Sequence, residues 1–184
     1  LSTALNRCLL EGETPAAAID TLSRWSRAVL GSTEFVYLTV AEVDPHRLQW
    51  STAGGPVPVV IRSEPRVPSG PTSGGATMPL GLDPTSRAEL STEPLGAGCR
   101  VVRVSAGTVR GLGAESETKL DSDLLLPFLL ETTDPDEDVM SLERAVRDRR
   151  EQSSAGADAG VSLHRADTTM LSVSVRSDSA ASAS

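Results

Sequence analysis

The chain has 184 residues and a formal net charge of −8, and 39% of its residues are hydrophobic. This composition is typical of a soluble globular domain, and such an acidic chain lacks the broad cationic surface that nucleic-acid phosphates require. No apolar run approaches the ~20 residues that a membrane-spanning helix needs. We therefore expect one domain over residues 1–176 and a disordered polar tail over residues 177–184.

The two cysteines, Cys8 and Cys99, do not have the CxxC spacing of structural zinc sites. Isolated thiols in a chain that shows no signal peptide predict a reducing, cytoplasmic location. The chain begins with Leu1 and not with methionine, which indicates a segment of a longer protein.

The first thirty residues predict two helices. Apolar residues recur at helical spacing in residues 2–11, and Gly12 can end this helix. In the second helix, Thr14 is a good N-cap, Pro15 suits the first helical position and Gly31 ends the pattern. The short link between the two favours a packed helical pair.

The pattern then changes to that of strands. Residues 34–44 and 48–54 predict a hairpin, and residues 55–63 predict a third strand. Residues 63–84, rich in proline, glycine and serine, predict a long surface loop. Two further strands are expected at residues 88–95 and 99–107, the second running into a tight glycine turn at Gly107.

The last third predicts helices followed by one strand. Pro127 should break a leucine-rich helix at residues 120–131, and a charged helix at 136–152 should carry a Glu143–Arg147 pair. We expect a flexible linker at residues 153–160 and a last strand at 168–176, which pairs with earlier strands so that the chain ends close the fold. Strands grouped between helices predict an α+β fold with a largely antiparallel sheet.

Common catalytic patterns find little support in the residues. His46 and His164 are the only imidazoles, His46 lies in an expected exposed turn, and no GxSxG, GxxxxGK[ST] or GxGxxG motif is present. The glycine-rich residues 53–56 favour a tight turn over a phosphate-binding loop. Asp121 and Asp123, and the acidic residues 134–138, are more simply interpreted as acids at helix N-termini than as ion sites.

Four stretches, taken in order, resemble one family. They are similar to motifs of bacterial SpoIIE-type serine phosphatase domains, which belong to the metal-dependent protein phosphatase (PPM, or protein phosphatase 2C-like) superfamily. The stretches are "EFVYLTVAEVDPHRLQWSTAGGPVPVVIR", "GATMPLGL", "LGAGCRVVRVSAGTVRG" and "RADTTMLSVSV". The helix "TPAAAIDTLSRWSRAVL" is also similar to its counterpart, so the resemblance covers almost the whole chain.

The resemblance implies a protein phosphatase 2C-like α-β-β-α sandwich of largely antiparallel sheets. The family's first strands and its first metal motif would precede this chain and are absent from it. In the family, aspartates hold two Mg²⁺ or Mn²⁺ ions, which activate a water for attack on a phosphoserine or phosphothreonine. Carboxylates are required because hard cations prefer oxygen ligands.

Carried over residue by residue, the resemblance predicts a degenerate metal site. The aspartate of the family's "TDG" motif falls on Ala106, and the first aspartate of its "DD-x-T" motif falls on Ala166. Asp167 keeps the second acidic position and is the residual metal position, and Thr169 keeps the threonine.

The site loops keep their glycines at Gly54 and Gly107. Gly55 stands where the family usually has histidine.

Three hypotheses follow. The first is a catalytically impaired regulatory domain, a pseudophosphatase that binds Mg or Mn weakly or not at all. It would bind a protein partner in bacterial signal transduction by partner switching, either an anti-anti-sigma-like protein or its own sensor domain, and homodimers occur in the family. The alternative is an active Mg/Mn-dependent phosphatase acting on an anti-anti-sigma-type protein, with ligands supplied upstream of Leu1. The third is an α+β binding domain outside this family.

Overall fold

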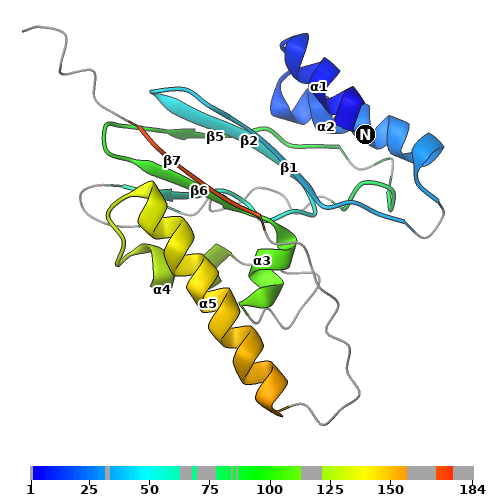
Figure 1. Ribbon diagram of the computed structural model, residues 1–184. Helices are drawn as coiled ribbons and strands as arrows, with labels where there is room; N and C mark the ends of the chain where they lie inside the picture. Colours follow the sequence, from blue (N-terminus) through cyan, green and yellow to red (C-terminus); the bar gives the residue numbers. More distant parts are fainter. Residues whose placement is uncertain are drawn as a thin grey trace, which may run out of the picture. The chain divides into compact units, whose positions relative to one another are not determined.

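The computed structural model describes residues 2–31, 34–62, 68–69, 78–83, 85, 87–112, 122–156 and 169–175 (Figure 1). The chain divides into two compact units, each with its own sheet. The first unit consists of Leu1–Val57 and Pro71–Leu95, and the second of Pro58–Gly70 and Gly96–Ser184. Within the described ranges, no helix has the length and apolar character needed to cross a membrane.

The first unit joins a helical pair to a three-stranded sheet. Helices α1 (Ser2–Leu10) and α2 (Pro15–Val29) contact each other, and α2 packs on strands β1 (Leu38–Val43) and β2 (Arg47–Ala53). The strand order is β1-β2-β5, with β5 at Ser91–Pro94 and every pairing antiparallel.

The predicted helical pair and hairpin are confirmed in this unit. The Thr14 hydroxyl caps α2 by accepting from the amide of Ala17 at 3.3 Å, and Pro15 is the first helical residue. The core between α2 and the sheet consists of apolar residues from both layers, namely Ile19, Leu22, Val40, Ala53 and Leu80.

The second unit joins a four-stranded antiparallel sheet to its own helices. Its strand order is β4-β3-β6-β7, formed by Pro68–Ser69, Val59–Ile61, Arg100–Val104 and Met170–Ser174. Helix α3 spans Ala106–Gly111, a 3₁₀ turn at Ser122–Leu125 leads into α4 (Leu126–Leu129), and α5 spans Pro135–Gly156. Helix α5 packs on β6 and β7, and valines of the sheet meet leucines of the helices in the core.

The predicted α+β class is confirmed, and several details of the prediction are wrong. Strand β1 begins at Leu38 and not at residue 34, because Val36 makes only an isolated bridge with Leu80. The linker expected from residue 153 begins later, because α5 continues to Gly156.

The third error concerns Gly107, which is not a turn. Ser105 caps a helix in which Gly107 is the second residue, and Gly107 is not among the positive-φ glycines. The predicted pairing of the last strand with an earlier one is confirmed, because β7 pairs with β6; the fourth error is the expected closure by the chain ends, since β6 comes from the middle of the sequence. Most of the loop expected at residues 63–84 lies outside the described residues.

A buried polar network links the sheet of the second unit to α5. Arg100, only 7% exposed, donates from Nε to Asp138 Oδ2 at 3.0 Å and from Nη2 to Asp138 Oδ1 at 3.2 Å. Nη2 also donates to the carbonyl of Leu129 at 3.2 Å and to that of Thr132 at 3.0 Å. Asp138 is fully buried and also accepts from the hydroxyls of Thr132 and Ser172. Each charge is therefore matched and hydrogen-bonded, as burial requires.

We predict that Asp138→Ala lowers the free energy of unfolding of the chain by about 3–5 kcal/mol, because it leaves the Arg100 guanidinium buried without its counter-ion. The measurement is equilibrium unfolding in urea. The matched control is Glu143→Ala on the same helix, which removes an exposed ion pair with Arg147 and should change stability by less than about 1 kcal/mol. Equal losses for the two variants would contradict the assigned role of the network.

Candidate functional site

The candidate site lies in the second unit, where β6 ends and α3 begins. Ser105 is the N-cap of α3, and its hydroxyl accepts from the amide of Thr108 at 3.3 Å. Ala106 is the first helical residue and is half-buried. Serine is a favoured N-cap residue, and this signal for a helix start was missed when the sequence was interpreted as a glycine turn.

Ser105 also binds the segment that leads into β7. The amide of Ser105 donates to the carbonyl of Thr169 at 2.8 Å, and the amide of Thr169 donates back to the Ser105 hydroxyl at 3.0 Å. The Thr108 hydroxyl donates to the same Thr169 carbonyl at 3.2 Å. Ser105 and Thr169, which are 64 positions apart in the sequence, therefore meet where β6 ends and β7 begins. The resemblance predicts that the two motifs containing these residues lie together. Ala166 and Asp167 themselves lie outside the described residues.

Among the described residues, the side chains at this place supply no carboxylate ligand for a divalent cation. The methyl group of Ala106 offers no ligand atom, and the Ser105 hydroxyl is held by two backbone amides. In the described ranges, no group of three His, Cys, Asp or Glu side chains is placed to share a metal ion. Arg103, two residues earlier on β6, is partly buried, and this desolvation lowers the pKa of its guanidinium.

The glycine loop predicted from the resemblance lies in the first unit, after β2. Gly54 has a φ of +67°, and a Cβ there would meet the ring of Pro79 at 2.6 Å. The backbone of Gly55 lies against β1, so that a Cβ would meet Thr39 Oγ1 at 2.6 Å and the Leu38 carbonyl oxygen at 3.0 Å. Thr39 is held in place because its hydroxyl donates to the Pro56 carbonyl at 2.8 Å. The structure therefore leaves no space for a histidine at position 55.

The other candidate residues behave as structural groups. His46 is exposed in the turn between β1 and β2, while His164 and Asp121 lie outside the described residues. Asp134 accepts from the amides of Asp136 and Glu137, both at 2.9 Å, which confirms the interpretation of these acids as belonging to a helix N-terminus. Sequence reasoning missed that Asp138, in the same run, turns inward to Arg100.

We predict that Gly55→Ala lowers the free energy of unfolding by about 1–3 kcal/mol, because the added methyl overlaps Thr39 and the β1 backbone. Thermal or urea unfolding measures the change. Gly96→Ala is the control: a Cβ at Gly96 meets nothing within 4 Å, so this variant should stay within about 0.5 kcal/mol of the parent. A tolerated Gly55→Ala would show that the loop has space for a side chain.

Comparisons with known proteins agree with this arrangement. Over residues 1–175, the chain matches the family described as Stage II sporulation protein E. It is similar to the phosphatase domain of the cell fate determinant SpoIIE from Bacillus subtilis, with a TM-score of 0.55 and 17% identity over 96% of this chain and 73% of that chain. No protein of curated function matches it significantly.

Two further solved structures share the fold. The RsbU and RsbW domains of a Mycobacterium tuberculosis protein give a TM-score of 0.68 and 22% identity, over 95% of this chain and 47% of that chain. The catalytic domain of the serine/threonine phosphatase PstP, in complex with two manganese ions, gives a TM-score of 0.51 and 14% identity, over 93% of this chain and 78% of that chain. At these identities the likeness establishes the fold, a mixed helix and antiparallel-sheet architecture of the protein phosphatase 2C type.

Proposed function

This chain belongs to the SpoIIE family, and we propose that within it the chain is a regulatory pseudophosphatase, which binds a protein partner without hydrolysing a phosphate. The observation that carries the proposal is Ala106. It stands at the helix start where the resemblance places a metal-binding aspartate. The hydroxyl of its neighbour Ser105 accepts hydrogen bonds from two backbone amides.

A pair of divalent cations needs carboxylates around it for electrostatic reasons. A pair of Mg²⁺ or Mn²⁺ ions, when bound, supplies an activated water and neutralises phosphate charge. Two such ions repel each other strongly unless several carboxylates lie between and around them. Alanine at positions 106 and 166 removes two of those carboxylates, and Asp167 alone is a weak substitute.

The structural relatives support a regulatory setting. One is a cell fate determinant, and another carries RsbU and RsbW domains in one chain. We infer that the partner of this chain is a protein of a bacterial signalling circuit, either an anti-anti-sigma-like protein or the chain's own sensor domain. A cytoplasmic location and a homodimer belong to the same proposal.

The experiment restores the two aspartates. We predict that Ala106→Asp combined with Ala166→Asp, in the full-length protein, tightens Mn²⁺ binding by at least about tenfold, or ~1.4 kcal/mol, measured by isothermal titration calorimetry. The control is Ala17→Asp with Ala41→Asp, which adds the same charge at exposed positions of α2 and β1 and should leave Mn²⁺ binding unchanged.

Hydrolysis of a phosphoserine peptide decides between the pseudophosphatase and the active phosphatase. The unmodified full-length protein should show no chelator-sensitive turnover above background with Mn²⁺. Turnover that disappears on addition of EDTA would overturn the pseudophosphatase proposal and establish the active phosphatase in its place.

A further inference from the structure

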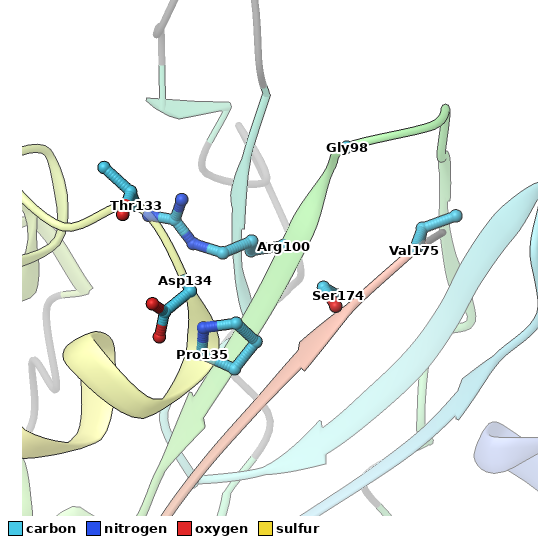
Figure 2. Close-up of a pocket in the computed structure, with 7 residues that line it drawn as sticks. All are labelled: Gly98, Arg100, Thr133, Asp134, Pro135, Ser174 and Val175. Atoms are coloured by element: carbon cyan, nitrogen blue, oxygen red, sulfur yellow. The ribbon is translucent and has the colours of Figure 1, made fainter. Parts of the chain in front are cut away.

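Strand β7 forms one edge of the sheet in the second unit, because the strand order ends with β6 and β7. Figure 2 shows the Ser174 end of β7 beside β6, where Arg100 is its register partner. No strand in the described part of the chain pairs with the other side of β7. Edges of natural sheets are usually protected by proline, charged side chains, bulges or short length, because an open edge can pair with another chain.

Strand β7 lacks these protections. Its five residues include no proline and no charged residue, and they pair with β6 in unbroken register, without a bulge. The opposite edge of the sheet differs, because β4 has only two residues and the first of them is Pro68. The sequence therefore leaves β7 as the edge of this sheet that is open to pairing.

The main chain of β7 presents a defined set of hydrogen-bonding groups at this edge. The Thr169 carbonyl accepts from the amide of Ser105 at 2.8 Å, so the main-chain groups of Thr169 face β6. Because the direction of these groups alternates along an antiparallel strand, every second residue after Thr169 also bonds to β6. The amides and carbonyls of the residues between them point away from the sheet, toward the open edge. These residues are Met170, Ser172 and Ser174.

Two apolar side chains of β7 are exposed on the face of the strand that lies away from α5. Leu171 is 54% exposed and Val173 is 37% exposed. The side chain of Ser172, between them, is on the other face and donates to Asp138 of α5. On the exposed face, the register partner of Leu171 in β6 is Arg103, which is partly buried. A strand that paired with β7 would therefore cover two apolar side chains as well as main-chain groups.

We propose that the open edge of β7 pairs with β7 of a second copy of this chain, antiparallel and about a two-fold axis at Ser172. In this register Ser172 faces the partner's Ser172, and Met170 faces the partner's Ser174, so every outward-pointing main-chain group of β7 is paired. Leu171 faces the partner's Val173 on both sides of the axis, which places apolar side chains against each other on one face.

The charges of the chain favour a second copy as the occupant of this edge. The chain has a formal net charge of −8, so two copies repel each other in most orientations. Strand β7 contributes none of this charge, and Asp138, which accepts from Ser172, is buried and paired with Arg100. Two copies can therefore meet at β7 without opposing like charges, and each supplies the uncharged alternating strand that the other requires.

This inference rests on the homodimer of the proposed function and gives that homodimer its interface. It does not depend on the loss of catalysis, because Ala106 takes no part in the pairing. Dimerisation and phosphopeptide turnover are measured separately, so the failure of one proposal is distinguishable from the failure of the other.

Sedimentation equilibrium of the full-length protein tests the interface. We expect a reversible dimer, and Leu171→Lys combined with Val173→Lys should raise its Kd at least about tenfold, because lysines of the two copies then face each other. The control is Leu9→Lys combined with Leu10→Lys on α1, which adds the same charge at exposed positions and should leave the Kd unchanged. A monomer at every concentration, a dimer that the two lysines on β7 do not weaken, or an equal change in both variants would overturn the proposal.

A pair of opposite charges on β7 tests the register. With the axis at Ser172, Leu171→Lys combined with Val173→Glu places each lysine opposite a glutamate of the partner. The Kd of this variant should therefore be at least about threefold lower than that of the variant with two lysines. An axis at Leu171 would instead place lysine opposite lysine, so equal Kd values for the two variants would exclude the assigned register.

Amide hydrogen exchange identifies any other occupant of the edge. In the proposed dimer, the amides of Met170, Ser172 and Ser174 become more protected as the protein concentration rises. Protection of the same amides in a monomer would assign the edge to another segment of the same polypeptide, and that result contradicts pairing with a second copy.

Discussion

The second unit depends on the buried pair of Arg100 and Asp138. Arg100 comes from β6 and Asp138 from α5, and their partners Thr132 and Ser172 come from the α4–α5 connection and β7. The hydrogen bonds of the two charged groups therefore connect a helix, a loop and two strands. Replacing such a pair by apolar groups often preserves stability, whereas removing one partner does not. The pair thus acts chiefly by specifying where α5 lies on the sheet of this unit.

The elements that the sequence predicts well are those with local causes. Thr14 and Pro15 begin α2 wherever the rest of the chain lies, because the cap and the fixed φ act within one turn. The Glu143–Arg147 pair forms at 2.9 Å for the same reason. Asp138 shows where such rules end. Its position in an acidic helix start predicts an exposed residue, and only a partner 38 residues earlier turns it into a core group.

The contact between Ser105 and Thr169, where β6 ends and β7 begins, was predictable in part. The interpretation of Gly107 as a turn was wrong because a glycine after a strand can lie either in a turn or in the first turn of a helix. The Ser105 hydroxyl caps the helix and so favours the second arrangement. No local pattern links Ser105 to Thr169, since their hydrogen bonds follow from the pairing of β6 with β7. The resemblance to a family supplied that long-range information, because it placed Ala106 and Ala166 in one site before any pairing was known.

The connection between β6 and β7 at Ser105 and Thr169 is made by uncharged groups. Aspartates gathered around absent cations repel one another, which strains the loops that carry them. Alanine at position 106 removes one source of that repulsion. The Ser105 and Thr108 hydroxyls, together with paired backbone groups, then hold the two segments together through Thr169. In the other unit, the uncharged Thr39 hydroxyl lies against the Gly55 backbone and donates to the Pro56 carbonyl. Hydrogen bonds between uncharged groups thus contribute to holding both loops in place.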